Sequence, residues 1–147
     1  MSVLKDIADA LAAGLDAETF SSVTVQPSVE RKNWPTYDVE QLADPVIAVT
    51  PAGIETARAS RESWQYDYAV NVFVGRHTPT EESADEMVEF AEQVADAIRL
   101  HQWDEAVDFP AGVTSPMTVE VDLNPDEALT ERNVWRAIIT ANYRVHR

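Results

Sequence analysis

Apolar residues recur along the chain with two different periods, and these periods predict its secondary structure. Near the N-terminus they follow the three- and four-residue spacing of one helical face, with Ser2 placed to cap the helix and Gly14 near its end. This stripe consists of Leu4, Ile7, Ala8, Leu11 and Leu15. Such a stripe usually packs into a core, so we expect an amphipathic N-terminal helix.

A second helix is predicted over residues 78–102. Thr78 suits the N-cap, Pro79 the first helical position and Glu81 the reciprocal capping-box position. The predicted buried stripe consists of Met87, Phe90, Ala91, Val94, Ala97 and Ile98. The remaining positions are rich in carboxylates, and acids early in a helix complement its dipole.

Strict alternation predicts two long strands, at residues 64–74 and 133–145, each with one apolar face. Gly75 is expected to end the first. The apolar faces consist of Trp64, Tyr66, Tyr68, Val70, Val72 and Val74, and of Trp135, Ala137, Ile139, Ala141, Tyr143 and Val145. The aromatic residues among them form either a binding platform or, as is more usual at alternate strand positions, part of the core.

Shorter strands are predicted at residues 23–26, 45–51 and 116–123, the second of them closed by a proline at each end. Between the elements we predict loops at 30–38 and 104–115, single helical turns at 39–43 and 124–129, and either a long connection or a hairpin arm at 52–63. The order α-β-β-β-α-β-β predicts a single α+β domain, residues 1–147, whose antiparallel or mixed β-sheet has flanking α-helices.

Charge is the outstanding property of the composition. The 147 residues include 26 Asp and Glu but 11 Lys and Arg, for a net charge of −15, and no cysteine. Such a surface repels phosphate backbones, which argues against specific nucleic-acid binding. The acidity is explained by solubility, by adaptation to a halophilic host or by steering toward a basic partner. The sequence has neither a run long enough to span a bilayer nor a signal-peptide pattern, so no membrane partner is expected.

The sequence contains no recognisable catalytic or metal-binding motif. His77, His101 and His146 are not spaced as metal ligands, and four glycines leave no phosphate-binding loop. Asp122, Asn124 and Asp126 resemble the start of a calcium loop, but the glycine and the bidentate glutamate that such a loop needs are absent. We therefore expect neither an enzyme nor a cofactor.

Two groups of side chains are candidates for functional surfaces. The acids of the second helix form i,i+4 pairs opposite the apolar stripe, where a solvated face explains them better than acid–base chemistry does. These acids include Glu82, Asp85, Glu86 and Glu89. Trp34 and Trp103 fall in or beside predicted loops, where an exposed indole favours a partner that covers it.

The layout resembles the tail-terminator and head-to-tail neck proteins of long-tailed bacteriophages, over nearly the whole chain. The shared features are an N-terminal amphipathic helix, a loop with Trp34-Pro35, a strand closed as Val46-Ile-Ala-Val-Thr-Pro51, an arginine-containing segment at Ser60-Arg61, the strand Tyr66-Asp-Tyr-Ala-Val-Asn-Val-Phe-Val, an acidic helix ending near Ile98 and a last strand ending Ala141-Asn-Tyr-Arg-Val. The resemblance is one of pattern and length, with no single diagnostic motif.

The resemblance implies a virion protein, assembled in the host cytoplasm, that forms a homo-oligomeric and commonly hexameric ring. That ring would cap the tail tube, contact the tail tube protein and neck or connector proteins, and let DNA pass without specific binding. We expect Arg58 and Arg61 to meet a neighbour's carboxylates in the ring, with Trp34 and Trp103 as further contacts. Glu82, Asp85, Glu86 and Glu89 would line the lumen.

Other functions remain open at this point. Another head-tail connector or head-completion protein would share the same features. An acidic inhibitor that mimics nucleic acid and binds a basic protein would use the charge of −15. An adaptor or an unfamiliar enzyme would show its site only in the folded protein.

Overall fold

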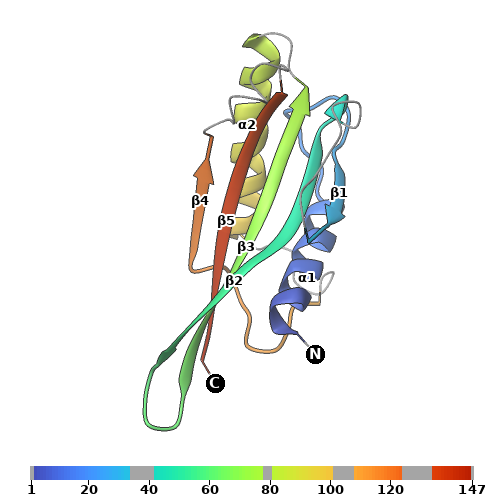
Figure 1. The fold of residues 1–147 in the computed structure, drawn as a ribbon. Helices are drawn as coiled ribbons and strands as arrows, with labels where there is room; N and C mark the ends of the chain where they lie inside the picture. Colours follow the sequence, from blue (N-terminus) through green and yellow to red (C-terminus); the bar gives the residue numbers. More distant parts are fainter. Residues whose placement is uncertain (1, 34–41, 78–80, 101–107, 124–133, 147) are drawn as a thin grey trace.

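The computed structural model describes residues 2–33, 42–77, 81–100, 108–123 and 134–146. Its elements, in chain order, are α1 (Val3–Ala17), β1 (Ser28–Arg31), β2 (Val46–Arg58), β3 (Trp64–His77), α2 (Glu81–Leu100), β4 (Thr118–Asp122) and β5 (Val134–His146). The strands form one sheet in the order β1-β2-β3-β5-β4 (Figure 1). The predicted order of helices and strands is confirmed.

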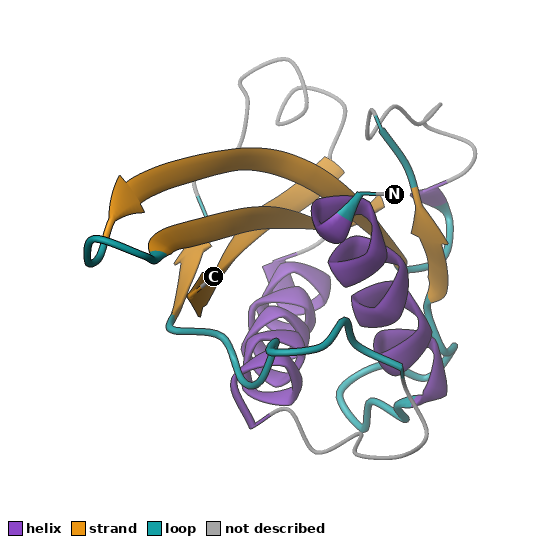
Figure 2. Ribbon diagram, turned by 90° about the horizontal axis from the view of Figure 1, so that it is seen from below, coloured by secondary structure: helices purple, strands orange, loops and turns teal. Residues whose placement is uncertain are grey.

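The sheet is mixed. β1 pairs with β2 in parallel, while the pairs β2–β3, β3–β5 and β5–β4 are antiparallel. The two helices lie side by side on one face of this curved sheet (Figure 2). One core fills the space between the two layers. The predicted α+β class, with a mixed sheet and flanking helices, is confirmed.

Helix α1 forms where the capping residue and the apolar spacing predict it. The Ser2 side chain accepts a hydrogen bond from the backbone N–H of Lys5 at 3.2 Å, which satisfies one of the unpaired donors of the first turn. Its buried face consists of Ile7, Ala8, Ala10, Leu11, Ala12, Gly14 and Leu15. This face packs on the sheet beside β1 and β2.

Helix α2 buries the predicted stripe completely at Met87, Phe90, Ala91, Val94 and Ile98. Phe90 meets Phe20 edge-on, with ring centroids 5.2 Å apart. The predicted cap at Thr78 and Pro79 lies outside the described residues. The contact between Phe20 and Phe90 ties the segment after α1 to the second helix.

The apolar faces of β3 and β5 form the centre of the core, as their alternation predicts. Tyr68 and Tyr143 are almost fully buried partners across the two strands. The other fully buried positions of these faces are Val70, Val72, Val74, Ala137, Ile139 and Ala141. Trp64 differs, because 44% of its surface is exposed. Of the two alternatives for the strand aromatics, membership of the core therefore does not hold for Trp64.

The prediction of a strand at residues 23–26 is also wrong. The Gln26 side chain bonds both the N–H and the C=O of Phe20, at 2.9 and 3.1 Å, and folds the segment into turns. Gln93 of α2 bonds Ser21 and Ser22 and holds the same turns from the other side. The first strand begins instead at Ser28 and takes in Glu30 and Arg31, which were predicted as loop.

Strand β2 does not end at Pro51, as the sequence predicts, but continues to Arg58. Pro51 has no N–H to donate, and the register of β2 against β3 shifts between Pro51 and Gly53 as it does at a bulge. Because β1 pairs only with residues 46–49 of β2, the proline removes no donor from that pairing. Residues 52–58 thus form one arm of a hairpin, one of the two predicted alternatives.

Gly75 likewise does not end its strand, which runs on to His77. On the face of the sheet away from the helices, the Phe73 side chain lies over Gly75 within a second, smaller apolar cluster. The other members of this cluster are Leu42, Val46, Ala48 and Val134. The helical turn predicted at 39–43 is described only from Leu42 onward, and the turn predicted at 124–129 lies outside the described residues.

Candidate assembly surface

The β2–β3 hairpin extends well beyond the helices and forms an arm, defined here as residues 54–64 (Figure 1). Pairing of β2 with β1 ends at Val49, and pairing of β3 with β5 ends at Gln65. Between Arg58 and Trp64, β2 and β3 therefore pair only with each other. Residues 54–62 are exposed without interruption.

The tip of the arm is closed by a compact set of hydrogen bonds. The N–H groups of Ala59 and Ser60 donate to the carbonyl of Ser63 at 3.1 and 3.2 Å. The hydroxyls of Ser60 and Ser63 lie 2.7 Å apart. A two-stranded ribbon is marginally stable alone in water, so these bonds and the attachment to the sheet hold the arm in shape.

Two cations lie at this tip without a carboxylate partner among the described residues. Arg58 places its guanidinium over the Trp64 ring, 5.5 Å from the ring centroid, and donates to the Arg61 carbonyl at 3.5 Å. Other arginines of the described part do have carboxylate partners: Arg31 with Asp9, Arg76 with Glu86, Arg99 with Asp96 and Arg144 with Asp67. The charges of Arg58 and Arg61 are therefore available to another molecule.

The arm also exposes apolar surface on one face. Cross-strand partners share a face, so Ile54 and Arg58 lie on the same side as Tyr68 and Trp64, toward the helix layer. Ile54 is 56% exposed and Trp64 is 44% exposed. Aromatic and arginine side chains dominate the energetics of protein interfaces. The combination favours a contact surface.

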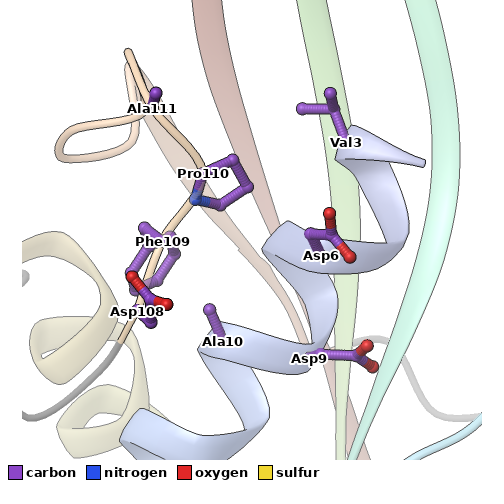
Figure 3. Close-up of a pocket in the computed structure, with 8 residues that line it drawn as sticks. All are labelled: Val3, Asp6, Asp9, Ala10, Asp108, Phe109, Pro110 and Ala111. Atoms are coloured by element: carbon purple, nitrogen blue, oxygen red, sulfur yellow. The ribbon is translucent and has the colours of Figure 1, made fainter. Parts of the chain in front are cut away.

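An open hollow of about 710 Å³ lies between the first half of α1 and the segment after residue 107 (Figure 3). Its lining residues are Val3, Asp6, Asp9, Ala10, Asp108, Phe109, Pro110 and Ala111. Asp9 points away from the loop and binds Arg31 at 3.0 Å. Among the described residues, Asp6 and Asp108 have no cationic partner. The hollow thus presents apolar walls and two available carboxylates.

The loop wall of the hollow is held in place by a turn and by the core. Val113 donates its N–H to the carbonyl of Pro110 at 3.1 Å, and Gly112 has a φ of 85°, a conformation that glycine adopts without strain. Phe109 packs on the Tyr143 ring, with 6.1 Å between centroids. Burial raises the pKa of Tyr143, so this phenol stays neutral beneath the loop.

The four acids predicted to line a lumen do lie together on the exposed side of α2. Glu82, Asp85, Glu86 and Glu89 are all exposed, opposite the buried stripe of the helix. Glu86 accepts from Arg76 at 3.3 Å, so its charge is partly compensated. The other three make this side of the helix strongly negative.

The face of the sheet away from the helices carries polar cross-strand pairs. Arg144 donates to both oxygens of Asp67, at 2.9 and 3.1 Å, and Thr140 donates to Asn71 at 3.0 Å. The Arg144 guanidinium lowers the pKa of Asp67 below its ordinary value of 3.8, mainly through the hydrogen bonds. These side-chain pairs connect β3 to β5 near the base of the arm.

Of the four predicted interface residues, the structure places Arg58 and Arg61 together at the arm tip, while Trp34 and Trp103 lie outside the described residues. Sequence reasoning named Trp64 among strand aromatics for which a binding platform was the less usual alternative, and it missed the hollow. Trp64 continues the alternation of its strand, which gives no sign that the helix layer stops short of it. The hollow joins α1 to residues about a hundred positions away, and no local pattern signals that contact.

The described part of the chain holds no group of three or more His, Cys, Asp or Glu side chains arranged to bind a metal ion. In the same ranges, no helix combines the length and apolar character needed to cross a membrane.

Comparisons with solved structures give a likeness in fold. No protein-family model and no curated protein matches this sequence. A chain from a solved structure entitled "Virion of native gene transfer agent (GTA) particle" has a similar fold, with a TM-score of 0.64 and 12% sequence identity. The match covers 99% of this chain and 98% of that chain. The two chains therefore share a fold from end to end.

Proposed function

We propose that the protein is a structural component of a virion, a tail terminator that forms a ring on the tail tube and joins the tail to the head. The observation that carries the proposal is the end-to-end likeness in fold to a chain of a gene transfer agent virion. The sequence pattern shared with phage tail terminators supports the same role. That role needs neither catalysis nor a cofactor.

The arm supports the ring. A ring of identical chains needs two different surfaces that fit each other, because its contacts are heterologous. Arg58, Arg61 and Trp64 supply cationic and aromatic groups on a projection that leaves the body of the molecule. A projection of this kind reaches a neighbour without moving the core. We assign it to the contact between adjacent chains.

The acidic side of α2 supports a passage for DNA. If the three uncompensated acids Glu82, Asp85 and Glu89 line the lumen of the ring, the negative potential keeps the phosphate backbone from adhering. The net charge of −15 per chain acts in the same direction.

The mass and shape of the assembled protein test the proposal. Native mass spectrometry and negative-stain imaging would be carried out over a range of concentration and salt, with and without purified tail tubes from a long-tailed phage. Six chains of 16.4 kDa give a ring of about 98 kDa. We expect closed rings, free or at tube ends. A protein that stays monomeric alone and leaves tube ends bare contradicts the terminator role.

A further inference from the structure

The arm and the hollow lie at the same end of the molecule but cannot meet within one chain. The N-terminal half of α1 and the hollow beside it lie at the end from which the arm leaves the sheet (Figures 1 and 2). The arm runs away from α1, toward the side on which β4 lies. The arm of a chain therefore does not enter the hollow of that same chain.

We propose that the arm tip of one copy docks in the hollow of the next copy. Arg58 and Arg61 would lie against Asp6 and Asp108. The inference rests on the proposed ring, and it adds which two surfaces make the contact.

Charge complementarity selects this pair of surfaces. The tip carries two guanidinium groups and the hollow two carboxylates, none of which has an oppositely charged partner among the described residues. In a chain with 26 acids and 11 basic side chains, available cations are the scarcer group. Arginine and carboxylate form short, charge-assisted hydrogen bonds, and these gain strength where apolar walls exclude water.

The apolar parts of the two surfaces also correspond. Trp64 and Ile54 on the arm are about half exposed, and the hollow offers Val3, Phe109 and Pro110. Its volume of about 710 Å³ is large enough for several side chains. Docking would remove both apolar surfaces from water, which is the main driving force of association.

The geometry also bears on ring closure. The hollow is lined by α1 and the segment after residue 107, and the arm is formed by β2 and β3, so in the proposed contact each copy receives one arm and gives one arm. Contacts of this head-to-tail type generate a ring when the rotation closes and a filament when it does not. The same pair of surfaces therefore repeats at every junction.

Disulfide trapping between two single-cysteine variants tests the contact. The chain has no cysteine, so every thiol is placed by design. Glu62→Cys lies at the tip and Ala111→Cys in the wall of the hollow, and both substitutions spare the four charged residues of the proposed contact. A disulfide needs Cβ atoms about 3.5–4.5 Å apart, so its rapid formation reports contact.

The two variants would be mixed, one of them with a mass tag, and oxidised mildly. The control replaces Ala111→Cys by Ala43→Cys, another exposed alanine that does not line the hollow. We expect mixed dimers to form at least about tenfold faster with Ala111→Cys, and expect Arg61→Glu in the tip variant to remove that advantage. Equal rates with both partners overturn the inference.

Imaging of the unmodified protein separates this inference from the proposed function. Closed rings with selective trapping support both. Closed rings without selective trapping overturn the docking and leave the ring. Selective trapping in open filaments alone supports the docking and contradicts the terminator role. Monomers without trapping overturn the docking, and they overturn the terminator role as well if the tube ends stay bare.

Discussion

At the scale of single residues, Gly75 shows how one missing side chain permits a local arrangement. The Phe73 ring lies across the glycine on the face of the sheet away from the helices. A Cβ atom at Gly75 would come within 2.8 Å of two ring carbons, closer than such atoms pack. Glycine is therefore required here for contact and not for an unusual backbone conformation.

Gly75→Ala should destabilise the protein by about 1–3 kcal/mol, because the Phe73 ring must leave its place in the small cluster. Chemical denaturation measures the change. Gly53→Ala is the matched control, since a Cβ at that glycine meets nothing within 4 Å. Equal effects of the two substitutions would exclude the ring contact as the cause.

Asp67 makes stability depend on pH. Its folded-state pKa is lowered by Arg144, so the ionised carboxylate stabilises the fold above the ordinary value of 3.8. The stabilisation is lost as the pH falls through the lower folded-state value. Asp67→Asn should therefore lower the free energy of unfolding at pH 7, and the difference from the unaltered protein should shrink below about pH 4.

Urea denaturation at pH 7 and pH 3 measures this difference. Asp96→Asn removes one partner of a more exposed ion pair, whose side chains are 62% and 63% accessible, so its effect at pH 7 should be small. A deficit for Asp67→Asn that is the same at both pH values would contradict the role given to Arg144.

At the scale of elements, alternation identified β3 and β5 because each has one buried and one polar face over most of its length. The same rule failed for β2, whose residues 54–58 are exposed on both faces and so carry no period. It failed at residues 23–26 because side chains of Gln26 and the distant Gln93 hold turns where the local residues favour a strand. The pairing of β2 with β3 decided the first case, and the side-chain bonds of Gln26 and Gln93 decided the second.

The arm gives a prediction at this scale. Arg61→Glu should raise the concentration needed for half-assembly by at least about tenfold, because it places a carboxylate where the proposed contact needs a cation. Analytical ultracentrifugation measures assembly, and circular dichroism checks that the monomer stays folded. The Arg61 side chain is exposed, so the fold should not change.

Arg99→Glu is the control for this reversal, because it makes the same change of charge at an exposed position on α2. If both reversals weaken assembly equally, net charge and not the arm governs association. If neither does, the arm is not a contact between copies.

At the scale of the whole molecule, the sequence predicted the class of fold and the location of two charged groups, Arg58 with Arg61 and the acids of α2. It did not predict how far the arm projects or that a hollow lies beside α1. Both depend on where the layer of helices ends relative to the sheet. That boundary is set by packing between segments far apart in the chain.

The proposed lumen can be tested by reversing its charge. The triple variant Glu82→Lys, Asp85→Lys, Glu89→Lys should assemble and then retain double-stranded DNA at low salt, with release as the salt rises past about 0.1 M. The control is a second triple variant with the same change of charge at exposed sites elsewhere, Asp16→Lys, Asp44→Lys, Glu120→Lys. Gel-shift and filter-binding assays compare the two. Equal retention would remove α2 from the lumen.

The strands of the arm are the strands of the core. β3 runs from the tip into the sheet without a break and pairs with β5 from Gln65 to His77, while β2 follows it with one bulge. A pull on the tip along the strands therefore loads many hydrogen bonds in parallel, as shear, and does not peel them apart one by one. A tensile load applied at the tip is therefore carried into the sheet, through the pairing of β3 with β5.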